Sequence, residues 1–197
     1  MVATLGIAIL VICGGTDLSA GYSISFGGSL AAACLGWWHL LVAVAVIAGI
    51  SACVLLSLVN GILSIKLKIN SLMFTLGTMT VYSGISNTFT GQKAIFNLPD
   101  GYKMIGQGSL FGVIPIPALI MVLAVAAISF LLKKMCFGRY TFAVGGNAQA
   151  ARLEGIHVTR TKRIVYAIGG ALFGISATML TARNGFCERD NRRGHRV

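Results

Sequence analysis

Residues 18–65 read LSAGYSISFGGSLAAACLGWWHLLVAVAVIAGISACVLLSLVNGILSI, and none of these 48 residues is Asp, Glu, Lys or Arg. One helix needs only about 20 apolar residues to cross a bilayer, so this stretch is long enough for at least two crossings. In the whole chain 56% of the residues are hydrophobic and 11% are charged, whereas a soluble domain carries roughly 25% charged residues. The composition therefore predicts a membrane protein.

Further apolar runs flank this stretch. Within the stretch itself, Trp37 and Trp38 lie between two apolar runs, where the indoles of an aromatic belt meet the membrane interface. Residues 86–116 are polar and rich in turn-forming residues, so we expect an external loop there. The predicted fold is an all-α, polytopic transmembrane helical bundle. After a first apolar run at 1–13, its predicted spans are residues 22–35, 40–59 (ending at Asn60 and Gly61), 72–85, 118–132 and 164–182.

The segment 14–21, GGTDLSAG, interrupts the apolar sequence. It holds three glycines, two hydroxyl residues and Asp17 within eight positions. Irregular backbone is not tolerated against lipid, so this segment must be buried in protein or line a wet cavity. We therefore predict a broken helix near residues 14–21.

The net charge of +11 is concentrated in two blocks. Residues 133–163 carry seven Lys or Arg and one Glu, and residues 183–197 carry five Arg, one Glu and one Asp. Lys and Arg beside membrane spans are retained on the cytoplasmic side, which makes 133–163 a predicted cytoplasmic loop. Counting membrane crossings from that loop puts Lys66 and Lys68 on the cytoplasmic side and residues 86–116 on the outer side. The same count puts the basic tail on the outer side, which contradicts the rule for Lys and Arg. No aromatic-interleaved basic face accompanies the charge, so we expect no nucleic-acid binding.

Motifs for catalysis or metal binding are missing from the sequence. The five cysteines show no CxxC spacing and indicate small core residues, not disulfides or metal ligands. The three histidines have no partners at motif spacing, and neither a phosphate-binding Gly-x4-Gly-Lys-Ser/Thr loop nor an HExxH sequence occurs. We therefore expect no catalytic residue, no metal, no cofactor and no ATP hydrolysis by this chain.

A short helix with defined ends is predicted inside the basic loop, over residues 148–153. Asn147 is a good N-cap, and Gly155 stands where a left-handed residue ends a helix. Ile156 is then placed to contact Ala151 in a Schellman motif. The small side chains of Ala150 and Ala151 would let another surface approach closely. The helix is either a solvated loop helix or a docking element.

Asp17 is the only acidic residue before Asp100, and an ionisable group at membrane depth is costly unless it is paired or wet. It could cap a half-helix through its carboxylate, contact a solute, or contact neighbouring helices. Other polar residues near the ends of spans could line a solute pathway, or equally form hydrogen bonds between helices. These candidates are Ser19, Asn60, Asn70, Thr75 and Thr78.

Several segments together resemble the ribose/xylose-type permease family of ABC importers. They are GGTDLSAG at 14–21, FTLGTM at 74–79, GRYTFAVGGN at 138–147 and AARLEGI at 150–156. The family's order and spacing are kept, and the resemblance covers roughly residues 1–185. It implies that the helix in the basic loop is a coupling helix seated in a groove of an ATPase. The residues it marks for that role are Gly138, Arg139, Gly145, Gly146, Asn147, Ala150, Ala151, Arg152, Gly155 and Ile156.

The resemblance also implies a function and partners. The function would be that of the permease subunit of an ABC importer in the cell inner membrane, moving a monosaccharide or related small solute. The partners would be a separate ATPase subunit, a periplasmic or lipid-anchored solute-binding protein, a second permease copy and membrane lipid. Two alternatives remain open on the sequence: a truncated, non-functional remnant of such a permease, and a passive membrane channel or scaffold.

The chain departs from the family pattern at both ends. It lacks the family's first helix, and the family would continue after Gly185 with an acidic segment and further spans. Residues 186–197 instead read FCERDNRRGHRV. We therefore predict a partial transmembrane permease domain at 1–185 and a basic tail at 186–197 that is frameshifted or disordered.

Overall fold

A computed structural model describes residues 1–67, 69–91, 99–110 and 114–184. The described residues form nine helices and one short antiparallel hairpin. The elements are α1 (Val2–Ile12), α2 (Ala20–Gly36), α3 (Val42–Leu67), α4 (Ser71–Thr90), α5 (Asp100–Gln107), β1 (Ser109–Leu110), β2 (Ile114–Pro115), α6 (Ile116–Lys134), α7 (Cys136–Gly146), α8 (Ala148–Leu153) and α9 (Val158–Asn184). The helical bundle predicted from the sequence is confirmed, with the two-residue strands as its only departure in the described part.

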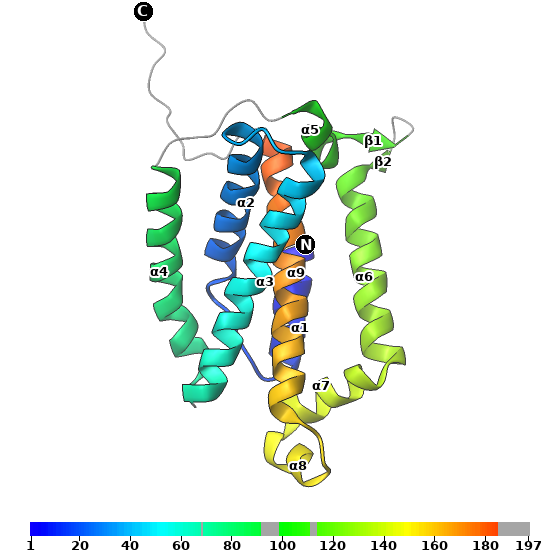
Figure 1. Ribbon diagram of the computed structural model, residues 1–197. Coiled ribbons are helices and arrows are strands. Elements are labelled where there is room, and N and C mark those ends of the chain that lie inside the picture. Colours follow the sequence, from blue (N-terminus) through cyan, green and yellow to red (C-terminus); the bar gives the residue numbers. More distant parts are fainter. Residues whose placement is uncertain (68, 92–98, 111–113, 185–197) are drawn as a thin grey trace, which may run out of the picture.

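The long helices run side by side, with α3 and α9 at the centre (Figure 1). The short helices α7 and α8 lie at one end of the bundle, which we call the basic end. Helix α5 and the hairpin lie at the opposite end, together with the α2–α3 connection and the end of α9. The connection from α3 to α4 returns to the basic end. The chain therefore alternates between the two ends in the order expected from the charge pattern.

Three of the described helices are long and apolar enough to cross a membrane: α3, α6 and α9. Helix α4 has 20 residues but is not among them, because Gly, Ser, Thr, Tyr and Asn dilute its apolar residues. Helix α2, with 17 residues, starts after the broken segment and contains several Gly and Ser residues. Three of the predicted crossings thus meet the criterion by length and composition.

Helix α3 does not end at Asn60 and Gly61, as the sequence predicted, but continues to Leu67. Asn60 is fully buried, and its side-chain amide has hydrogen-bond partners inside the bundle. A Cβ on Gly61 would lie 2.6 Å from Cγ of Tyr166, so the glycine lets the ring of α9 lie against the α3 backbone. Tertiary packing therefore overrides the local helix-ending signal.

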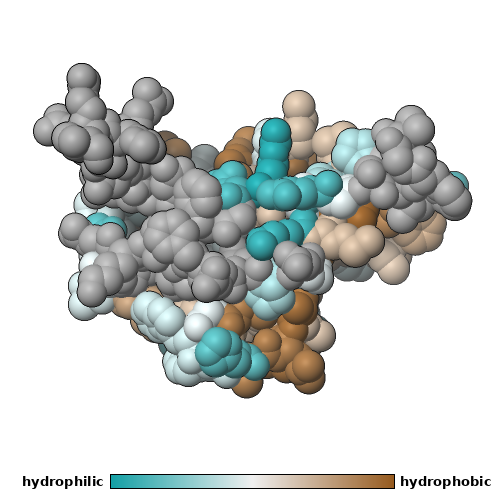
Figure 2. All heavy atoms as spheres, turned by 90° about the horizontal axis from the view of Figure 1, so that it is seen from above, coloured by the Kyte–Doolittle hydropathy of each residue, from teal (hydrophilic) through white to brown (hydrophobic). Residues whose placement is uncertain are grey.

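The predicted external loop at 86–116 is partly ordered structure. Helix α4 extends to Thr90, and α5 and the hairpin follow. Helix α5 is preceded by Pro99, which suits a helix start because the missing N–H would be unpaired there anyway. It packs on α9: Tyr102 is fully buried, and Gly106 meets the backbone of Arg183. The end of the bundle at α5 shows a hydrophilic patch near its centre, with hydrophobic surface below and beside it (Figure 2).

Two groups of buried residues form the core of the described bundle. One joins α1, α3, α7, α8 and α9 toward the basic end, and the other joins α2, α3, α5 and α9 toward the end with α5. The boundary predicted at residue 185 and the predicted tail 186–197 lie outside the described residues.

Candidate functional site

The predicted break in the first helix is confirmed. Helix α1 ends at Ile12 and α2 begins at Ala20, and the residues between them form turns and irregular backbone. Gly14 has a φ of +73°, a left-handed conformation that glycine adopts without steric cost. We call residues 13–19 the broken segment. Asp17 and Ser19 are 3% and 0% exposed, so this part of the segment is buried in protein.

The carboxylate of Asp17 organises the start of α2. Its Oδ1 accepts hydrogen bonds from Ser19 N at 2.9 Å and from Ser19 Oγ at 2.6 Å. This turn satisfies an N–H group that precedes the first turn of α2. Oδ2 of Asp17 is buried and has no hydrogen-bond partner among the described residues.

Asn60 of α3 extends this arrangement across the bundle. Its Nδ2 donates to Ser19 Oγ at 2.7 Å and reaches Asp17 Oδ1 at 3.5 Å. The hydroxyl of Tyr82, on α4, has two hydrogen-bond acceptors within reach. They are Asn60 Oδ1 at 2.8 Å and Leu56 O at 3.2 Å. Asp17, Ser19, Asn60 and Tyr82 form one buried network, called here the Asp17–Tyr82 network, that joins the broken segment to α3 and α4.

Tyr82 was missed by the sequence analysis. It lies seven residues after Thr75 and therefore on the same face of α4. That periodicity was the available signal, but the run also contains Thr78, Thr80 and Ser83, which obscure it. A tyrosine in such a run is also easily assigned to an interface belt.

Helix α4 makes two further contacts with the broken segment. Leu18 N donates to Thr75 Oγ1 at 3.3 Å, and Ser71 Oγ donates to Thr16 O at 2.8 Å. Ser71 Oγ is also hydrogen-bonded to the hydroxyl of Tyr166 on α9. The segment is thus tied to α4 through its backbone groups, whereas its side chains bond Asn60 of α3.

The remaining pathway candidates make local hydrogen bonds. Asn70 caps α4, with Oδ1 accepting from Leu72 N at 3.0 Å. Thr78 donates to the carbonyl of Thr75 within its own helix. The structure therefore brings Asp17, Ser19 and Asn60 together, adds Thr75 beside them, and leaves Asn70 and Thr78 apart.

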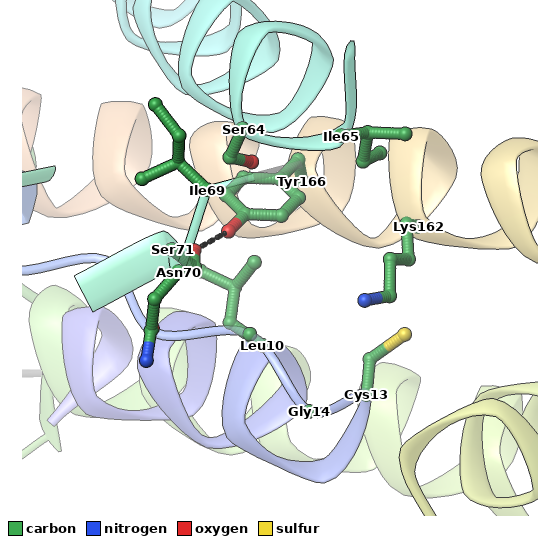
Figure 3. A pocket seen from close by; sticks show the side chains of 11 residues that line it. Leu10, Cys13, Gly14, Ser64, Ile65, Ile69, Asn70, Ser71, Lys162 and Tyr166 are labelled. Atoms are coloured by element: carbon green, nitrogen blue, oxygen red, sulfur yellow. Dashed lines mark hydrogen bonds between the residues drawn. The ribbon is translucent and has the colours of Figure 1, made fainter. Parts of the chain in front are cut away.

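A pocket of about 390 Å³ lies beside the broken segment, toward the basic end (Figure 3). It is formed where the end of α1, the end of α3, the start of α4 and the start of α9 meet. Its polar lining comes from Ser64, Asn70, Ser71, Lys162 and Tyr166, and Gly14 contributes backbone. No residue of the Asp17–Tyr82 network lines it.

Two of the glycines assigned to the coupling loop, Gly138 and Gly145, allow close backbone packing. Residues 136–146 form helix α7, which the sequence analysis did not predict. A Cβ on Gly138 would collide with the carbonyl of Leu132, and one on Gly145 would collide with the carbonyl of Ile12. Gly146 meets nothing within 4 Å. Arg139 is exposed, with Nη2 3.2 Å from the sulfur of Cys136.

The start of α8 has the predicted cap. Oδ1 of Asn147 accepts hydrogen bonds from Gln149 N at 2.9 Å and Ala150 N at 3.1 Å. Both donors belong to the first turn, whose N–H groups lack partners inside the helix.

The end of α8 has the predicted Schellman motif. Gly155 has a φ of +82°. Ile156 N donates to Ala151 O at 2.9 Å, and Gly155 N donates to Arg152 O at 3.1 Å. These two bonds are the pair that defines the motif. Both ends of this short helix are therefore fixed by its own sequence.

The outward face of α8 differs from the prediction. Ala151 is 2% exposed and belongs to the core of this chain, so it does not present a small surface to a partner. Ala150 and Arg152 are exposed, and Leu153 is 90% exposed. Leu153 is thus the apolar side chain that α8 presents outward. The sequence analysis missed it because cap signals define the ends of a helix and not its buried face.

Comparisons with known proteins place these features in a larger context. A family model described as branched-chain amino acid transport system / permease component matches residues 1–190. The ribose import permease protein RbsC of Bacillus subtilis (strain 168) is 37% identical over 182 residues, which cover 90% of this chain and 55% of the relative. No solved structure gives a significant match.

Two further relatives match a shorter part of the chain. The L-arabinose transport system permease protein AraH of Escherichia coli (strain K12) is 38% identical over 125 residues, or 64% of this chain and 38% of the relative. The autoinducer 2 import system permease protein LsrC of Klebsiella pneumoniae is 36% identical over 127 residues, or 64% of this chain and 37% of the relative. The chain spans about half the length, or less, of these curated relatives.

Proposed function

The chain belongs to the family of branched-chain amino acid transport system permease components, and from this premise we propose that it works as a permease subunit of an ABC importer. It is a multi-pass membrane protein by family and by its apolar helices. Its solute would be a monosaccharide or a related small molecule, because relatives are permeases for ribose, L-arabinose and autoinducer 2. Its membrane would be the cell inner membrane.

The observation that carries the coupling role is helix α8. A six-residue helix is too short to be stable by itself, and here both of its ends are capped while Ala151 anchors one face in the core. Its opposite face ends in Leu153, a large apolar side chain in water. Such a rigid projection suits docking into a groove of a second protein. We propose that this protein is the separate ATPase subunit, which would hydrolyse ATP for the transport cycle.

The other partners follow from the same assignment. A periplasmic or lipid-anchored binding protein would deliver the solute at the end with α5, and a second permease copy would complete the path. The sidedness rests on the seven Lys or Arg residues of 133–163, which favour a cytoplasmic position for the basic end.

For the broken segment we propose a positioning role. Asp17 holds the start of α2, and Asn60 and Tyr82 tie that start to α3 and α4. The four side chains of the network are at most 5% exposed, so a solute does not reach them in this conformation. The network would set where α2 and α4 stand relative to α3.

The coupling role is tested by Leu153→Asp. The change removes the exposed apolar contact without entering the core, so we expect loss of ATPase copurification and of ATP-dependent uptake of radiolabelled ribose or arabinose in vesicles. Met135→Asp is the matched control, since Met135 is an exposed apolar residue of the same end outside α8. Retained ATPase binding in Leu153→Asp, or equal loss in both variants, would contradict the proposal. Uptake that persists without ATP would instead support a passive channel.

A further inference from the structure

The pocket at the basic end, lined by Lys162 and Tyr166, is not used by the proposed transport function. It opens at the level of the basic helices and loops, where a membrane protein meets lipid headgroups and cytoplasmic solutes. Its volume of about 390 Å³ falls within the usual range of ligand pockets. Its lining mixes apolar residues with hydroxyl, amide and ammonium groups. It is therefore a built site whose ligand is unassigned.

Lys162 gives this pocket its charge. The side chain is half-buried, and its ammonium group points across the pocket toward the sulfur of Cys13 (Figure 3). No Asp or Glu is among the lining residues. The carboxylate of Asp17, in the neighbouring network, already bonds Ser19 through Oδ1. A partly desolvated cation without a facing carboxylate favours an anion in the space before it.

The end of α1 also borders the pocket. The carbonyls of Ile9, Leu10 and Val11 accept hydrogen bonds from the N–H groups of residues 13–15, and the carbonyl of Ile12 lies against Gly145 of α7. None of these contacts involves Lys162, so its ammonium group keeps N–H donors for a ligand.

The start of α4 forms the opposite wall of the pocket. Asn70 uses its Oδ1 for the cap of this helix, and its Nδ2 group points away from Lys162, with Leu10 between the two side chains (Figure 3). The N-terminus of α4 lies here as well, and a helix of 20 residues presents the positive end of its dipole at this point. Ser71 and Tyr166 are less suited, since Ser71 donates to Thr16 O and the two hydroxyls bond each other.

We propose that this pocket binds a phosphate-type oxyanion, carried by a lipid headgroup or by a small soluble phosphate. Lys162 supplies the charge, the start of α4 presents the positive end of its dipole from the opposite wall, and the ring of Tyr166 forms a further wall. A ligand here would join the starts of α4 and α9 to the ends of α1 and α3. Its occupancy would therefore stabilise the bundle at the end that carries α8. Basic pockets between membrane helices on the cytoplasmic side bind anionic headgroups.

The test measures the melting temperature of the purified chain in a neutral detergent while one additive is titrated. The additives are phosphatidylglycerol, phosphatidylcholine and inorganic phosphate. We expect phosphatidylglycerol or phosphate to raise the melting temperature and phosphatidylcholine not to do so. A shift with phosphate alone identifies a soluble anion, and a shift only with phosphatidylglycerol identifies a lipid headgroup. No shift with either overturns the proposal.

Variants locate the effect in the pocket. Lys162→Gln should weaken the apparent affinity about fivefold, the size expected for one lysine-to-headgroup contact. Arg163→Gln is the matched control: it removes the same charge at the next residue, which is exposed and outside the pocket lining. Equal loss in both variants, or none in Lys162→Gln, overturns the proposal. Lys162→Arg keeps the positive charge and should retain the stabilising shift, so it separates loss of charge from loss of packing in Lys162→Gln.

Discussion

Helices α9 and α4 are attached to the same helix, α3, in two different ways. Helix α9 is pressed against α3 through glycines: a Cβ on Gly170 would lie 2.8 Å from Cα of Val54, and one on Gly174 would lie 2.5 Å from Cα of Ile50. Helix α4 has glycines too, but a Cβ on Gly77 or Gly84 would meet nothing within 4 Å. The buried side chains of α4 are instead polar or hydroxyl-bearing. Among the described residues they are Thr75, Tyr82 and Ser86.

The difference reflects what drives association in a membrane. Apolar side chains gain little by leaving lipid for protein, so helices associate through close backbone packing or through hydrogen bonds. Close packing admits one arrangement, because a shift of the two backbones brings atoms into collision. Hydrogen bonds between helices can exchange partners. We infer that α3 and α9 form a fixed frame and that α4 is the helix able to change position relative to it.

The largest effect is expected from breaking the fixed contact. Gly170→Ala places a methyl group against the α3 backbone, and we expect a loss of about 2 to 3 kcal/mol in the free energy of unfolding. Gly77→Ala is the matched control on α4, where the methyl group meets open space and improved helix propensity should stabilise by up to about 1 kcal/mol. Titration with SDS in mixed micelles measures both. Equal destabilisation by the two variants would remove the distinction between the helices.

A smaller but more local effect is expected from Asn60→Leu. The change removes the amide that joins Ser19 to Tyr82 and leaves buried polar groups without partners, at a cost of about 1 to 3 kcal/mol. Because Asn60 holds α4 and the broken segment, hydrogen exchange should rise there more than in α9. Ser51→Leu is the control, since Ser51 is an exposed hydroxyl residue of α3 that bonds only the carbonyl of Ala48. A uniform rise in exchange across all helices would argue against a separate α4 unit.

Tyr82→Phe tests the same connection with less disturbance. The ring remains and only the hydroxyl bonded to Asn60 is lost, so we expect a loss of stability between about 0.6 kcal/mol, the average for such bonds in a membrane protein, and about 1.7 kcal/mol, the maximum. Tyr22→Phe, on α2, is the matched control because that side chain is only half-buried. In the transport assay, the Tyr82 variant should alter uptake while ATPase copurification through α8 stays intact. Loss of copurification would show that the network also supports the basic end.

Features with a local physical cause were predictable from the sequence. The broken segment follows from glycines and Asp17 in an apolar context, and the ends of α8 follow from Asn147 and Gly155. Features set by contacts between distant residues were not. Helix α3 continues through Gly61, and the ring of Tyr166, on another helix, lies in the space that a side chain would occupy there. Likewise the burial of Ala151 depends on which face of α8 meets the core, and cap residues carry no information about that face.

The same distinction between local causes and distant contacts holds for the candidate site. The presence of Asp17 and Ser19 in one buried turn could be expected from their spacing of two residues. Their meeting with Asn60 and Tyr82 could not, because it depends on how α3 and α4 cross the broken segment. Lys162 lay within the counted basic charge of 133–163, and nothing in a charge count distinguishes a residue that lines a pocket from one that faces water.

The smallest effect is expected from a pair of variants on α4. The pair tests whether a hydroxyl group stabilises the protein through a specific contact with the broken segment or through its polarity in general. Thr75→Val and Thr78→Val remove the same hydroxyl from the same helix, three residues apart. Thr75 accepts the N–H of Leu18 in the broken segment, whereas Thr78 bonds only its own helix. We expect Thr75→Val to cost about 0.6 kcal/mol, the average for a hydrogen bond between membrane helices, and Thr78→Val to have no measurable effect. Thermal unfolding in detergent compares the pair. If the two variants lose the same stability, the hydroxyls of Thr75 and Thr78 act through general polarity, and the attachment of α4 must rest on its other contacts, those of Tyr82 with Asn60 and of Ser71 with Thr16.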